Sequence, residues 1–119
     1  HPDWPETGIA ATMASMRRRE DGTVEPRLSL ERHLAILRGL WDDDPWQRLP
    51  DVATPVLLIP AGAADPARSA EARAAIERAT SLLPRSRVAW VAGDHDLHAQ
   101  HPERIAALLA GAVEDGFFA

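Results

Sequence analysis

The sequence predicts an α/β fold built around a parallel strand–helix–strand unit, and three observations carry that prediction. Branched apolar residues fill Val56 to Ile59 between two prolines, as is typical of a strand buried on both faces of a parallel sheet. A second short apolar run covers Arg87 to Val91, and a helical stretch from about Pro66 to Leu83 separates the two runs. A last helix is predicted from Pro102 to Glu114, with proline at its first position. Residues 51–119 are therefore expected to form a β-α-β-α unit.

The first fifty residues are predicted to supply helices and a linker, but no strand. One helix is expected from Thr7 to about Glu20, and Asp21-Gly22 ends it with a turn. Ser29 is a good N-cap for a second helix, from Leu30 to Trp41. Each helix carries an apolar stripe, which is more often core than a cofactor site: Ile9, Met13 and Met16 in the first, and Leu30, Leu34, Leu37 and Trp41 in the second.

A sheet of two parallel strands leaves both outer edges unpaired and apolar, and so small a sheet is marginally stable. Since the first half is predicted to be helical, it cannot supply the further strands. We therefore expect the rest of the sheet to lie outside these 119 residues, either before His1 or in another polypeptide.

A carboxylate and an imidazole follow the two predicted strands. Asp65 stands three residues after Gly62, and His95 stands two residues after Gly93. The carboxyl ends of neighbouring parallel strands meet at one edge of a sheet, which is where such folds bind ligands. The two side chains are therefore expected to meet, so that the carboxylate orients the imidazole and the imidazole takes a proton from a nucleophile.

The stretch from Asp51 to Val113 resembles the end of an α/β-hydrolase. The turn Gly62-Ala63-Ala64-Asp65-Pro66, the turn Gly93-Asp94-His95 and the helix start His101-Pro102-Glu103 fall in the order found in that family. The resemblance implies the last two strands of a doubly wound hydrolase sheet, with acid before base as in the family.

The same resemblance implies roles for particular residues. Asp65 would be the acid and His95 the base of a catalytic triad, and residues 1–50 would be the end of the lid that the family inserts before the acid-bearing strand. One departure is Asp94, where the family usually has a small residue; an adjacent carboxylate favours the protonated imidazole.

A second departure is the lack of a nucleophile elbow, because no Gly-x-Ser-x-Gly occurs in the sequence. We therefore expect a C-terminal fragment or subunit of a hydrolase that is inactive by itself and is completed by a missing N-terminal part. The bond cleaved would be an ester, an amide or a related bond. A nucleophilic aspartate, as in haloalkane and epoxide hydrolases, stays open beside a serine.

Two other functions are compatible with the same residues. The chain could be a non-catalytic interaction module that binds a partner along its open sheet edge. It could also bind a metal through His95, His98 and His101, but Pro102 argues against one helix through all three. The carboxylates Asp42 to Asp44 are expected to be a solvated turn. We expect neither a metal nor a cofactor.

Composition excludes several classes of partner. The net charge of −5 argues against nucleic acid, and the basic cluster Arg17 to Arg19 is expected to be a solvated helix end. Without cysteine there is no disulfide or thiolate chemistry, and no apolar run approaches the roughly 20 residues that cross a bilayer. We expect a cytoplasmic protein with a small apolar substrate, suggested by Met13, Met16, Trp41 and Trp46.

Overall fold

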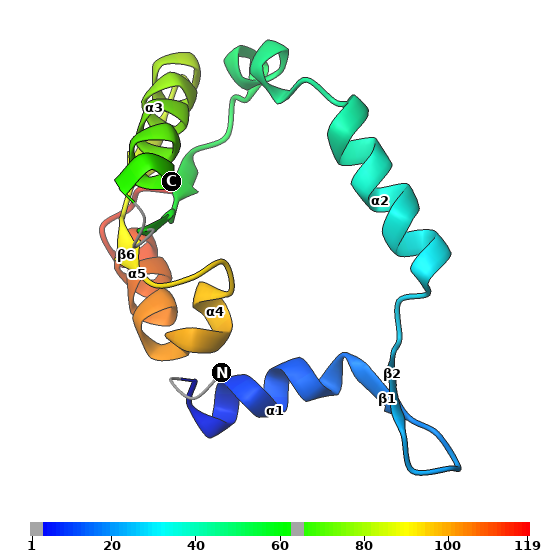
Figure 1. The fold of residues 1–119 in the computed structure, drawn as a ribbon. Coiled ribbons are helices and arrows are strands. Elements are labelled where there is room, and N and C mark those ends of the chain that lie inside the picture. The colour runs from blue at the N-terminus through cyan, green and yellow to red at the C-terminus, as the bar shows by residue number, and fades with distance from the viewer. Residues whose placement is uncertain (1–3, 63–65) are drawn as a thin grey trace.

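The chain mixes helices and short strands in an open, ring-like arrangement rather than around one centre. We describe residues 4–62 and 66–119 of a computed structural model. In Figure 1 the C-terminal helices and strands lie on one side, and the N-terminal elements arch away from them. The radius of gyration is 17.2 Å, against roughly 13.5 Å for a compact domain of this length. No helix of the described ranges is long and apolar enough to cross a lipid bilayer.

The N-terminal segment forms a helix followed by a β-hairpin, so the prediction of a helix to Glu20 was wrong. Helix α1 (Glu6–Ala14) begins after Pro5 rather than at Thr7, and it ends at Ser15. Strand β1 (Met16–Arg18) then pairs antiparallel with β2 (Val24–Pro26). The expectation that the first half holds no strand was therefore also wrong, although this hairpin is a sheet of its own.

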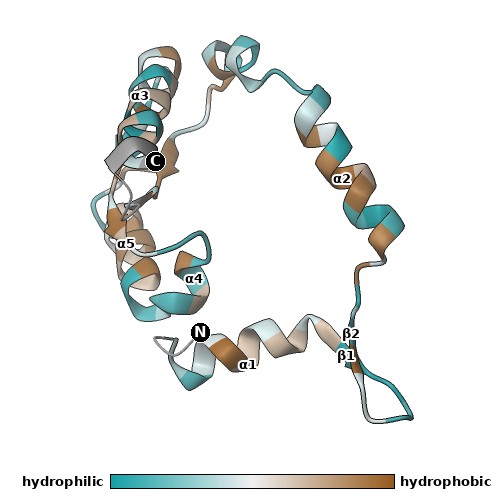
Figure 2. Ribbon diagram, viewed as in Figure 1, coloured by the Kyte–Doolittle hydropathy of each residue, from teal (hydrophilic) through white to brown (hydrophobic). Residues whose placement is uncertain are grey.

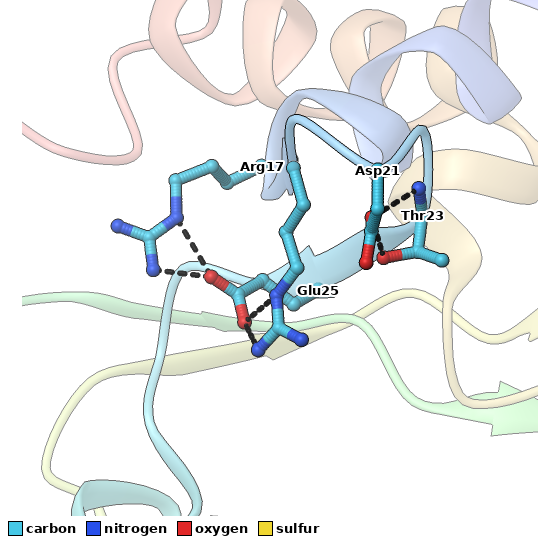
Figure 3. A network of polar contacts seen from close by, with 5 residues as sticks. Arg17, Asp21, Thr23 and Glu25 are labelled. Carbon is cyan, nitrogen blue, oxygen red and sulfur yellow. Dashed lines mark hydrogen bonds and ion pairs between the residues drawn. The ribbon is translucent and has the colours of Figure 1, made fainter.

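The hairpin explains where the sequence-based expectation failed. Asp21-Gly22, taken as the end of a helix, forms the hairpin loop, in which Gly22 has a φ of +85° that favours glycine. Glu25 faces Arg17 across the strands and forms ion pairs with both Arg17 and Arg19 (Figure 3). Arg17 and its neighbours therefore lie in and beside a strand, not at a helix end, because pairing across the hairpin outweighs local helix propensity.

Helix α2 (Leu30–Asp42) has the predicted bounds to within one residue, and the Ser29 side chain accepts a hydrogen bond from the backbone N–H of Arg32 at 3.4 Å. Its apolar stripe does not form a core. Every residue of α2 is exposed, Trp41 to 90%. Figure 2 shows apolar stretches along this helix, which stands apart from the C-terminal half.

Two short 3₁₀ helices, η1 (Pro45–Gln47) and η2 (Leu49–Asp51), lead back to the C-terminal half. The Asp44 carboxylate accepts from the backbone N–H of Trp46 at 3.2 Å, so this acidic turn acts as a cap. The guanidinium of Arg78 lies 4.3 Å from the centre of the Trp46 ring, which attaches the linker to the following helix.

The C-terminal half is the expected β-α-β-α unit, and the α/β class is confirmed. The strands that pair are parallel: β3 with β5, and β4 with β6. Within residues 4–62 and 66–119, no third strand joins them. The elements are β3 (Val56–Leu58), β4 (Ala61–Gly62), α3 (Pro66–Leu82), β5 (Ser86–Val88), β6 (Val91–Ala92), α4 (Leu97–Gln100) and α5 (Pro102–Glu114).

The strand β3 is half-buried, so the prediction of a strand buried on both faces was wrong for this chain. The cause is the width of the sheet, since two strands cannot shield each other's outer edges. Most of the buried apolar residues nevertheless lie in this half, namely Leu83, Val91, Leu97, Ala99, Ala112 and Phe117, while Trp4 is buried in the N-terminal half.

The C-terminal tail is fastened to strand β5. Gly116, with a φ of +73°, ends α5, and the N–H of Phe117 donates to the carbonyl of Ala112 at 3.0 Å. Arg87 donates to the carboxylate of Asp115 at 2.5 Å and lies 4.4 Å from the centre of the Phe117 ring. This hydrogen bond from Arg87 holds the pKa of Asp115 below its ordinary value.

Candidate functional site

The candidate site lies at the carboxyl end of the parallel strands. The segment from β3 to β4 runs beside the segment from β5 to β6. Backbone hydrogen bonds join the two segments, such as that from the N–H of Val91 to the carbonyl of Pro60 at 3.1 Å. The last paired residues are Gly62 and Ala92. The two segments that follow Gly62 and Ala92 therefore begin at neighbouring positions on the carboxyl edge of the sheet.

His95 stands on the loop between β6 and α4, and its side chain is exposed. The loop is held by hydrogen bonds on either side of the imidazole. The side-chain oxygen of Gln100 accepts from the N–H of Asp94 at 2.9 Å, and the Asp94 carboxylate accepts from the N–H of Asp96 at 3.0 Å. The Asp94 carboxylate is thus engaged with the backbone of the turn, which fixes the conformation of the loop that presents His95.

Glycine at position 93 leaves room for two side chains of α4. A Cβ atom at Gly93 would come within 2.6 Å of a methyl carbon of Leu97, a buried residue, and would also meet the side-chain oxygen of Gln100. A larger residue would force these side chains to move, because the turn before His95 lies close to the start of α4.

A small pocket of about 230 Å³ lies beside His95. Apolar side chains of Ile59, Leu97 and Ile105 line it together with His95 and His98. Ile59 comes from the chain that leads to Asp65, so the pocket is shared by both arms of the parallel pair. It places the imidazole beside an apolar wall, an arrangement suited to holding a small apolar group next to an imidazole.

Asp65, the predicted acid, lies outside the described residues. The other predicted site residue, His95, lies where the sequence placed it, on the loop after the second strand. The predicted contact between the two side chains stays a prediction.

The three histidines of the metal hypothesis do not converge. His95 and His98 line the pocket beside Ile59, whereas His101 lines a different pocket with Trp4 and Pro5. Among the residues that the structure describes, no group of three or more His, Cys, Asp or Glu side chains could hold a metal ion. His101 instead immediately precedes Pro102, the first residue of α5.

Sequence reasoning missed the contact between α1 and α4, the helix that follows the loop carrying His95. Gly8 is buried, and a Cβ atom there would overlap the carbonyl of Ala99 in α4, approaching its carbon to 2.8 Å. A pocket of about 330 Å³ is lined by Thr12 of α1, by Ser15 at the end of that helix and by His98 of α4. A glycine within a predicted helix is costly without a packing reason, and Gly8 was that signal.

The sequence matches no protein-family model, and no curated protein or solved structure is significantly similar to it. The function of the chain must therefore be inferred from its own residues and their geometry.

Proposed function

We propose that this chain is the C-terminal part of an α/β-hydrolase, in which His95 is the general base and Asp65 the acid that orients it. The nucleophile and the oxyanion hole come from a segment outside these residues. In the reaction, His95 takes the proton of the nucleophile as it attacks the carbonyl, and returns that proton to the leaving group. Water, deprotonated by the same imidazole, then releases the acyl group.

The observation that carries this proposal is the register of the parallel pair. Gly62 pairs with Ala92, and Asp65 and His95 each follow three residues later along their chains. Three residues span at most about 10 Å of backbone, so this register allows the two side chains to meet at the sheet edge. A carboxylate and an imidazole that meet there would be two members of a hydrolytic triad.

The surroundings of His95 support the same chemistry. Its imidazole is exposed and therefore open to a nucleophile supplied from elsewhere, while the adjoining pocket offers the apolar side chains of Ile59, Leu97 and Ile105. We infer a substrate with a small acyl or alkyl group next to the cleaved bond.

The test begins with the protein purified under a C-terminal tag from cells that express the complete gene. Its intact mass is recorded under denaturing conditions, and it is treated with a fluorophosphonate probe. We expect a labelled serine outside residues 1–119, in the same or a co-purifying polypeptide. His95→Ala should abolish labelling and Asp65→Asn should lower ester hydrolysis by about 10⁴-fold. Arg104→Ala, at an exposed position of α5, should leave both unchanged.

Two further outcomes decide the proposal. Hydrolysis of epoxides or haloalkanes that depends on His95, without labelling, assigns the nucleophile to an aspartate. A folded protein that takes no label and hydrolyses none of these substrates overturns the proposal.

A second candidate function is a non-catalytic module that binds a partner strand, and the open sheet favours it. Each parallel pair contains two strands, and no further strand of residues 4–62 and 66–119 covers its edges. Such an edge can accept an extended peptide through backbone hydrogen bonds. This candidate predicts that His95→Ala leaves every binding partner in place and that no hydrolysis is detected.

A further inference from the structure

Helix α2 presents an apolar face that is uncovered within the part of the chain that the structure describes. All of its 13 residues are exposed, including Leu30 at 71% and Leu40 at 70%. A helix of this length is marginal in water by itself and gains most of its stability from packing its apolar face. The helix therefore needs a partner surface.

The spacing of the apolar residues identifies the kind of surface. Leu30, Leu34, Leu37 and Trp41 follow one another at intervals of four, three and four residues. These intervals place the four side chains on one face of α2, at positions equivalent to d and a of a coiled coil, in which two helices pack along a seam. Leu40, at the adjoining g position, widens this face, and a face of this kind packs well against another helix.

The charges beside the seam identify that helix as a second copy of α2. Glu31 and Arg38 both occupy the e position, next to the seam, where residues of opposite charge set the pairing. In an antiparallel pair, e positions face e positions, so Glu31 of each copy lies near Arg38 of the other. In a parallel pair, Arg38 of one copy would lie near His33 of the other, so the two helices would have no pair of opposite charges beside the seam.

A groove at the start of α2 fits the same arrangement. It has a volume of about 600 Å³, and Leu28, Leu30 and His33 contribute to its lining. Trp41 stands eleven residues after Leu30, or about 16 Å along the helix, and is 90% exposed. In an antiparallel pair centred on the seam, Leu30 lies opposite the second copy's Trp41, so each indole reaches the other copy's groove.

We propose that two copies of this chain associate through antiparallel α2 helices, with each Trp41 seated in the groove beside Leu30 of the other copy. The interface is two-fold symmetric and self-complementary, as closed dimers require. With only one short helix from each copy, it is smaller than a standard interface, so we expect affinity in the micromolar range. The surface lies on a different element from His95, so the inference is independent of the hydrolase chemistry.

The test is sedimentation equilibrium of the full chain over a concentration series. We expect a dimer, which Leu34→Glu should abolish and Trp41→Ala should weaken by about 30-fold in Kd, the effect of removing an aromatic side chain seated in a groove. Circular dichroism checks that each variant keeps its helices.

Charge reversal tests the orientation. Arg38→Glu should weaken the dimer by about tenfold, because each dimer contains the Glu31–Arg38 pair twice. Glu31→Arg combined with Arg38→Glu should restore it. Arg32→Glu makes the same charge change on the opposite side of the helix and should have no effect.

Three results would overturn the proposal. One is a monomer at every concentration, with α2 amides either exchanging freely or protected by another part of the same polypeptide. Another is a dimer that Leu34→Glu leaves intact. The third is a double charge reversal that restores nothing.

Discussion

The two halves of this chain are ordered by different forces. In residues 51–119, apolar side chains such as Val91 and Leu97 are withdrawn from water, and helices, strands and tail hold one another. In residues 15–50, which follow helix α1, order comes from local hydrogen bonds, a capped helix and the ion pairs of one hairpin. The apolar side chains of α2 in the first half are exposed, whereas the second half contains a small group of buried apolar side chains.

Helices α2 and α5 make the contrast concrete, because each has 13 residues and one apolar face. In α5, Ala112 is buried and the helix end is fastened by Phe117 and Arg87. In α2, no residue is buried. Amphipathic patterning therefore predicts that a helix has a face to bury, and only the tertiary structure decides what covers it.

The largest expected effect is the difference in the free energy of unfolding between truncating a buried and an exposed apolar side chain. Leu97→Ala should lower the free energy of unfolding by about 2 to 4 kcal/mol, because Leu97 is 7% exposed and truncating its side chain leaves a cavity beside the loop that carries His95. Ile36→Ala in α2 should change it by less than about 0.5 kcal/mol, since Ile36 is exposed and alanine favours the helix. Urea unfolding followed by circular dichroism measures both. Equal losses would show that α2 packs as tightly as the C-terminal half.

Two glycines within helices sharpen the same comparison. Gly8→Ala should destabilise the protein by about 1 to 3 kcal/mol, because the added methyl group meets the Ala99 carbonyl and forces α1 away from α4. Gly39→Ala in α2 meets nothing within 4 Å and should stabilise the protein by about 1 kcal/mol.

Thermal unfolding of the two variants beside the wild type tests this pair of effects. If Gly8→Ala proved as harmless as Gly39→Ala, the close contact between α1 and α4 would be wrong.

The elements that sequence predicted well are those whose signals are local. Pro102 at a helix start, Ser29 at an N-cap and the branched run after Pro55 each determine structure within a few residues, and all three elements formed. His95 was placed on its loop because the Gly93 turn is equally local. These signals also sufficed to predict the parallel pair.

The elements that sequence predicted poorly depend on partners distant along the chain. Met16 to Arg18 became a strand because Glu25 and its neighbours pair with it, which the helical spacing of the preceding residues concealed. The contact of Gly8 with Ala99 joins segments about ninety residues apart, and no local pattern specifies that pairing. Gln100, whose side chain accepts a hydrogen bond from the N–H of Asp94, belongs to no sequence motif that would have indicated this role.

The smallest expected effect is the pH dependence of the N-terminal hairpin. Hydrogen bonds from Arg19 and Arg17 hold the pKa of Glu25 below its ordinary value, and hydrogen bonds from Thr23 do the same for Asp21 (Figure 3). Because these pKa values are lower in the folded than in the unfolded chain, the stabilisation is complete above the unfolded values, near 4.5 and 3.8. It is lost as the pH falls through the folded values.

Carbon-detected NMR titration of the two carboxyl groups measures these pKa values directly, and amide exchange at β1 and β2 reports the hairpin. Arg17→Gln should raise the pKa of Glu25 towards 4.5, since one of its two cationic donors is gone. Glu25→Gln should leave the hairpin with only the acid transition of Asp21, and it should not change the acid response of β5, which depends on Asp115. If Glu25→Gln shifts the acid loss of β5 and β6 together with that of the hairpin, the two halves unfold together, and burial in one half also stabilises the other.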